Sequence, residues 1–129
     1  MPTASAIKAL IVDDQLTSRA LIRDGLQQLG IVDIEMAGDG EEGLKVMMHK
    51  PVHLVISDLN MPKLDGIGFL RAVRANAPTK NAAFIMLTGR GDRDIIATAA
   101  KYGVNNYLVK PFTMPTLKSA IEAVLGKLK

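Results

Sequence analysis

Five polar side chains that are able to bind ions or take part in a reaction stand at the ends of short apolar runs. Asp13 and Asp14 end the first run, Asp58 the third, Thr88 the fourth and Lys110 the fifth. Two unit charges about 5 Å apart repel each other by roughly 3 kcal/mol at an effective dielectric constant near 20. If the three carboxylates meet, a divalent cation is their natural compensation, and an all-oxygen ligand set without cysteine favours Mg²⁺, with Mn²⁺ as the alternative ion.

The apolar runs that position these side chains are expected to be strands. They cover residues 9–12, 34–37, 54–56, 84–87 and 107–109. Apart from the second, they do not alternate with polar residues, which is typical of parallel strands covered on both faces. In such sheets, ligands bind at the carboxyl ends of the strands. The chemically capable residues therefore lie where a binding site is expected.

Segments with helical spacing separate the runs. In the last, Leu117, Ile121 and Leu125 recur on one face, Thr113 is a candidate cap and Pro115 is tolerated in the first turn. The other helix signals are a capping-box spacing from Asp39 to Glu42, candidate caps Asp65 and Asp92 before 66–75 and 93–102, and Gly30 after 16–29. Five strand–helix repeats predict an α/β doubly wound fold with helices on both faces.

Bulk composition limits the remaining options. The 129 residues, 48% of them hydrophobic, predict one domain over 1–129 with a core from about 7 to 128 and no output domain. The absence of cysteine favours the cytoplasm, and the first residues fit neither a signal peptide nor a membrane-inserted span. Basic residues are dispersed and aromatics make up only 4%, so nucleic-acid binding is a remote alternative. Met36, Met47, Met48 and Met86 stand in apolar or periodic runs and are expected in the core.

The joint spacing of these residues resembles that of a known family. Asp13-Asp14, Asp58, Thr88 and Lys110-Pro111, with the stretch DLNMPKLDG at 58–66, resemble the receiver domain of two-component response regulators over the whole chain. The resemblance implies a flavodoxin-like (βα)5 sandwich with a parallel sheet in the order 2-1-3-4-5. The first and third strands are neighbours in that order, so Asp13, Asp14 and Asp58 are expected to converge.

The resemblance also implies a role for each residue. Asp58 is expected to accept a phosphoryl group from a histidine kinase. Asp14, Asp58 and the backbone carbonyl of Asn60 are expected to ligate Mg²⁺, with Asp13 acting through a metal-bound water. Lys110 is expected to contact the phosphoryl oxygens, with its bond to Pro111 cis, and Thr88 to donate a hydrogen bond to them. Such a chain is a phosphoacceptor that assists its own phosphorylation and dephosphorylation, rather than an enzyme.

Within the family, the chain most resembles stand-alone chemotaxis receivers of the CheY type. In these receivers a face matching Arg93, Ile96, Ala100 and Tyr107 docks on the flagellar motor switch, and the tyrosine turns inward as Thr88 moves. On residue type alone, burial of the Tyr107 ring in the core is the favoured alternative. Two departures are Leu59, where many such proteins have tryptophan, and Ala120, where lysine often assists docking.

The expected partners are a chemotaxis-type histidine kinase, the flagellar motor switch protein or another downstream partner, and a phosphatase. The chain itself is expected to be a monomer. A phosphorelay intermediate, a cell-cycle receiver and a phosphate sink for a chemotaxis kinase stay open as alternative roles. An enzyme with an aspartyl nucleophile would need a second catalytic acid and a substrate cap, for which the chain has no space.

Overall fold

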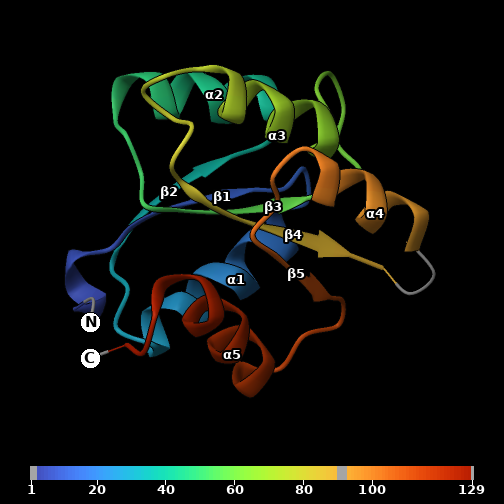
Figure 1. Cartoon of the computed structure of the whole chain (residues 1–129). Coiled ribbons are helices and arrows are strands. Elements are labelled where there is room, and N and C mark those ends of the chain that lie inside the picture. Colours follow the sequence, from blue (N-terminus) through green and yellow to red (C-terminus); the bar gives the residue numbers. More distant parts are fainter. Residues whose placement is uncertain (1–2, 90–92, 129) are drawn as a thin grey trace.

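Strands and helices alternate along the chain as the sequence predicts (Figure 1). The computed structural model describes residues 3–89 and 93–128, so the predicted cap Asp92 lies outside the described residues. A short 3-10 turn, η1 (Ala4–Ala6), precedes the first strand. The strands are β1 (Lys8–Val12), β2 (Asp33–Ala37), β3 (Leu54–Asp58), β4 (Ala83–Thr88) and β5 (Asn106–Val109). The helices are α1 (Leu16–Gln28), α2 (Gly40–His49), α3 (Gly66–Ala75), α4 (Arg93–Lys101) and α5 (Met114–Leu125).

The sheet is parallel throughout, in the order β2-β1-β3-β4-β5. Helices α1 and α5 cover one face, and α2, α3 and α4 cover the other (Figure 1). Each face has its own apolar core: Leu26 and Leu117 lie in the first, and Phe69 packs on Phe84 in the second with ring centroids 5.5 Å apart. The predicted doubly wound fold and its strand order are confirmed.

Local signals in the sequence explain where the helices begin and end. The side chain of Asp39 accepts from the Glu42 N–H at 2.9 Å, and Thr113 with Thr116 forms a complete capping box. At α3, Asp65 accepts from the Gly68 N–H at 2.8 Å. Gly30 follows α1 with φ of +89°. The box predicted at α2 is incomplete, because the Glu42 carboxylate accepts from Gly38 instead of reaching back to the N–H of Asp39.

Two of the four methionines expected in the core are exposed. Met47 and Met86 are buried, whereas Met36 is 39% and Met48 46% exposed. Met36 lies on β2, an edge strand with a neighbour on one side only. The expectation was wrong for Met36, because an apolar run does not reveal which strand is at the edge. It was wrong for Met48 because neighbouring residues of a helix face different directions, and Met47 takes the buried side of α2.

No helix among residues 3–89 and 93–128 is long and apolar enough to span a membrane.

The start of α3 is pressed against the strand end that carries Asp58. A Cβ at Gly66 would lie 2.5 Å from the backbone oxygen of Asp58 and 2.8 Å from the Cα of Leu59. We expect Gly66→Ala to lower the free energy of unfolding by about 1–3 kcal/mol, because backbone atoms on both sides must shift. Urea unfolding measures this loss.

Gly68→Ala is the matched control on the same helix. Its new Cβ would come closest, at 2.6 Å, to Cδ1 of Leu64, the far end of a flexible side chain. Alanine also favours a helix over glycine by up to about 1 kcal/mol. Equal losses in the two variants would contradict a backbone clash at Gly66.

Candidate functional site

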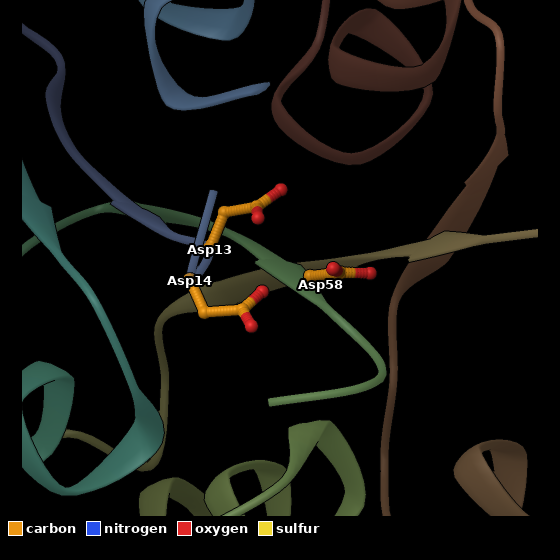
Figure 2. Close-up of side chains that lie close together, drawn as sticks. All are labelled: Asp13, Asp14 and Asp58. Atoms are coloured by element: carbon orange, nitrogen blue, oxygen red, sulfur yellow. The ribbon is translucent and has the colours of Figure 1, made fainter. Parts of the chain in front are cut away.

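Three carboxylates converge at the carboxyl end of the sheet. Asp13 and Asp14 follow β1, Asp58 ends β3, and one carboxylate oxygen from each lies within 4.8 Å of the others (Figure 2). Pairing of β1 with β3, which sets Val12 opposite Ser57, brings the two strand ends together. The predicted convergence is confirmed. The carboxylate oxygens form a hard, anionic donor set of the kind that Mg²⁺ prefers.

Asp13 is the fully buried member of the cluster, with 0% exposure. Its Oδ1 accepts from the backbone N–H of Gln15 at 3.0 Å, and its Oδ2 accepts from the Ser18 hydroxyl at 2.5 Å. Arg19 donates to the Asp13 carbonyl at 3.2 Å. Both carboxylate oxygens thus have protein donors, whereas Asp14 is exposed. This difference suits an indirect role for Asp13 and a direct one for Asp14.

Sequence reasoning missed Gln15, Ser18 and Arg19. The signal that could have found them is their place just after Asp13, where the first turn of a helix turns donors back toward a strand-end carboxylate.

Lys110 faces the two inner carboxylates. Its Nζ lies 3.3 Å from Asp58 Oδ1 and 3.5 Å from Asp13 Oδ2, and its side chain is one-third exposed. The backbone N–H of Lys110 donates to the Thr88 carbonyl at 2.8 Å, and the bond to Pro111 is cis, as predicted. The amine therefore stands as a point charge beside Asp58, open to solvent on one side.

Asp58 is partly buried and electrostatically strained. Burial raises the pKa of its carboxyl above the usual aspartate value, and the charge of Asp13 raises it further. Lys110 and the Leu59 N–H, which donates to Oδ1 at 2.8 Å, oppose that rise without cancelling it. A divalent cation beside Asp58 would favour the ionised form. Asn60 follows in the exposed connection after β3.

Thr88 is the last residue of β4, next to the strand that ends at Asp58. The side chain is buried, and within the described part of the chain its Oγ1 has no hydrogen-bond partner. A buried hydroxyl without a partner costs about 1–3 kcal/mol. The side chain is poised to donate to an acceptor placed near Asp58.

The predicted partner-face residues are surface residues on α4 and β5. Arg93 and Ala100 are exposed, Ile96 is half-buried, and Tyr107 is 47% exposed. A narrow hollow lined by Met86, Thr88, Ile95, Ile96, Ala99, Val104 and Tyr107 joins the threonine to the tyrosine. The alternative in which Tyr107 is buried in the core is wrong for this conformation. Leu59 and Ala120, the two residues that depart from the pattern of chemotaxis receivers, are both buried.

We expect Asp58→Asn to raise the melting temperature of the metal-free protein at neutral pH. The raised pKa means that the folded state disfavours ionised Asp58 relative to the unfolded chain. This penalty is complete above the folded pKa and vanishes as the pH falls below the ordinary aspartate value. Thermal melts across pH should therefore show a gain at neutral pH that disappears in acid.

The control for this melt is Asp24→Asn, which changes an exposed aspartate on α1 whose side chain is 56% exposed. A melting temperature for Asp58→Asn at or below that of the wild type at neutral pH would contradict the assigned strain.

Comparison with known proteins agrees with this geometry. The sequence pattern of the family described as response regulator receiver domain matches residues 9–122. The chain is 61% identical over 129 residues to a probable chemotaxis protein CheY from Rhizobium etli, covering 100% of both chains. It is 40% identical to chemotaxis protein CheY1 from Helicobacter pylori over 121 residues, 93% of this chain and 98% of that one.

Solved structures give the same result. The NMR structure of BeF3-activated response regulator CheY2-Mg²⁺ from Sinorhizobium meliloti is 61% identical, covers 100% of both chains and has a TM-score of 0.75. Chemotaxis protein CheY4 from Vibrio cholerae is 34% identical, with a TM-score of 0.86 over 92% of this chain and 98% of that one. With its site and fold, the chain belongs to the response regulator receiver domain family, and within it to the chemotaxis proteins of the CheY type.

Proposed function

We propose that this chain is a stand-alone phosphoryl-accepting switch in which Asp58 takes a phosphoryl group from a chemotaxis-type histidine kinase. The observation that carries the proposal is the convergence of Asp13, Asp14 and Asp58 with the Lys110 amine 3.3 Å from Asp58. That arrangement combines a nucleophile, a cation-binding set and a positive charge for phosphoryl oxygens. The 61% identity to a probable chemotaxis protein CheY from Rhizobium etli supports a chemotaxis receiver.

The metal is proposed to be Mg²⁺, with Mn²⁺ as the alternative. Asp14, Asp58 and the Asn60 backbone carbonyl would hold it, and Asp13 would act through a water. The buried, hydrogen-bonded Asp13 and the exposed Asp14 fit this division, and the Sinorhizobium meliloti relative is described with Mg²⁺. When bound, the ion supplies positive charge that relieves carboxylate repulsion and stabilises phosphoryl oxygens.

The proposed transfer forms an acyl phosphate. A carboxylate oxygen of Asp58 attacks the phosphorus of a phosphohistidine, the N–P bond breaks, and the imidazole leaves with the bonding pair and takes up a proton. Lys110 pairs with a phosphoryl oxygen as negative charge builds there. The Thr88 hydroxyl donates to another oxygen and so gains a partner that it lacks among the described residues. Attack by water on the phosphorus then releases inorganic phosphate and returns Asp58 to its free carboxylate.

The readout is proposed to lie on the face formed by Arg93, Ile96, Ala100 and Tyr107. Movement of Thr88 toward the phosphoryl group would enlarge the hollow that it shares with Tyr107. Tyr107, now 47% exposed, would then turn its ring inward. A partner that prefers the inward ring would in return stabilise the phosphorylated form.

That partner is proposed to be the flagellar motor switch protein, with a phosphatase ending the signal. The chain is proposed to act in the cytoplasm as a monomer and without binding nucleic acid, and its lack of cysteine suits a reducing compartment.

Incubation of the chain with an autophosphorylated chemotaxis kinase tests this function. We expect radiolabel to leave the kinase and appear on the chain when Mg²⁺ is present. Labelled chain should then bind a motor-switch peptide more tightly than unlabelled chain. Transfer without any gain in peptide affinity would replace the motor role by that of a phosphate sink, and no transfer at all would refute the switch.

A further inference from the structure

Arg74 links three parts of the chain at the end of the sheet opposite the phosphorylation site. It lies in the last turn of α3, and its guanidinium donates four hydrogen bonds. The acceptors are the carbonyls of Gly103 at 3.0 Å, Lys80 at 2.8 Å and Ala82 at 2.7 Å, and Oδ1 of Asn105 at 2.8 Å. One side chain thus joins α3, the approach to β4 and the turn between α4 and β5.

The bond to Asn105 has a further consequence for the sheet. Asn105 pairs with Phe84 twice: its backbone N–H donates to the Phe84 carbonyl at 3.0 Å, and its side-chain Oδ1 accepts from the Phe84 N–H at 2.7 Å. Since Arg74 donates to the same Oδ1, it holds the amide in the orientation that the second bond needs. Asn105, which immediately precedes β5 and lies two residues before Tyr107, is thereby fixed to β4.

Helix α3 also holds the residue that follows the C-terminal end of α4. Arg71, one turn before Arg74, places its guanidinium carbon 4.8 Å from the centre of the Tyr102 ring. Gly103 has φ of +88°, and a Cβ there would lie 3.2 Å from Nε of Arg74. The turn after α4 therefore fits closely around the guanidinium.

Elsewhere α4 is lightly attached. Within Arg93–Lys101 only Ala99 is buried, and Ile95 and Ile96 are half-buried beside the hollow that contains Thr88. Within residues 93–105, the helix is therefore firmly bonded just after its C-terminal end, at residues 102–105, and its body packs loosely next to Thr88. A movement of Thr88 against the middle of α4 would therefore tilt the helix about residues 102–105.

We propose that Arg74 is the positioning residue that makes the α4–β5 turn a fixed pivot, so that movement at Thr88 tilts α4 and turns Tyr107 without shifting the start of β5. The inference rests on the proposed switch function for the source of the movement. The pivot itself rests on contacts that need no phosphate. Four neutral acceptors spread around one planar donor explain why arginine is needed here and why lysine cannot replace it.

Hydrogen–deuterium exchange of the unphosphorylated chain tests the pivot by itself. In Arg74→Gln we expect exchange in the segment 99–107 to rise roughly 10- to 100-fold, because several bonds from a charged donor are lost. After correction for global stability, exchange in β1 and β3 should be unchanged. A uniform rise over the whole chain, or none, would overturn the pivot and leave Arg74 with a general structural role.

Two variants separate the geometry from the charge. Arg74→Lys should behave like Arg74→Gln, because a single amine cannot reach acceptors in several directions. Restoration of wild-type exchange by lysine would overturn the proposal. Arg71→Gln, the matched change one turn earlier, should leave exchange at Asn105 and Tyr107 unaltered. If Arg74→Gln does not fold, Asn105→Ala removes one acceptor and should loosen the same segment.

The link to the switch is read from the only two tyrosines, Tyr102 at the pivot and Tyr107 at the readout. In fluorotyrosine-labelled wild type with Mg²⁺ and beryllofluoride, the ¹⁹F signal of Tyr107 should shift and that of Tyr102 should stay. In Arg74→Gln, the Tyr102 signal should now move and the Tyr107 shift should shrink. Wild-type behaviour in the variant would overturn the pivot. A wild type that does not respond would refute the switch, while the exchange result still decides the pivot.

Discussion

Asp58→Asn is expected to reduce phosphoryl labelling by acetyl phosphate at least about 100-fold, while the fold is retained. Asparagine has the shape of aspartate but no anionic oxygen to attack phosphorus. Labelling should be measured by intact-protein mass spectrometry at fixed time points. Asp24→Asn, on the exposed side of α1, is the matched control and should be labelled like the wild type.

The same reaction should require a divalent ion. Without one, Asp13, Asp14 and Asp58 present uncompensated negative charge to an incoming phosphoryl dianion. A chelator should therefore suppress labelling of the wild type, and added Mg²⁺ should restore it. Undiminished labelling of Asp58→Asn, or labelling that a chelator leaves unchanged, would show that the acceptor or the metal requirement is assigned wrongly.

Thr88→Val is expected to uncouple phosphorylation from the readout. Valine keeps the volume of threonine but lacks the hydroxyl, which has no partner in this conformation among the described residues. The unphosphorylated variant should be at least as stable as the wild type, because no hydrogen bond is lost. With beryllofluoride, the valine cannot donate a hydrogen bond to the phosphoryl mimic and should stay in place, so the hollow beside Tyr107 should not open.

The measurement for this variant is the affinity of a motor-switch peptide with and without beryllofluoride. Allosteric coupling in proteins commonly amounts to about 5- to 150-fold, and we expect Thr88→Val to reduce the wild-type ratio nearly to one. Thr88→Ser, which keeps the hydroxyl, should retain most of it. Labelling of Asp58 should persist in both variants. A wild-type ratio in Thr88→Val would place the coupling elsewhere.

Much of the site could be predicted because it follows from strand ends. Each apolar run ends next to the polar residue that the sheet places at its carboxyl edge, and a parallel sheet gathers those edges on one side. Asp58, Thr88 and Lys110 can therefore be recognised as candidate site residues from their positions at strand ends. The strand order, which makes β1 and β3 neighbours, came from the family resemblance rather than from the runs.

What the sequence did not reveal depends on tertiary contacts. The donors to Asp13 come from a helix turn whose direction is set by packing, so the place of Ser18 after Asp13 does not by itself show that its hydroxyl donates to that carboxylate. Arg74 looks like an ordinary charged residue near the end of a helix, yet its four acceptors come from segments up to 31 residues away along the chain. The exposure of Met36 likewise follows from the edge position of β2.

The most direct test of the central claim is to find where the phosphoryl group goes. An acyl phosphate on aspartate is reduced by borohydride to homoserine, which peptide mass spectrometry locates. After phosphotransfer from a chemotaxis-type histidine kinase in Mg²⁺, homoserine should appear at position 58 and at neither 13 nor 14. Homoserine at another position, or none despite a phosphorylated kinase, would contradict the account.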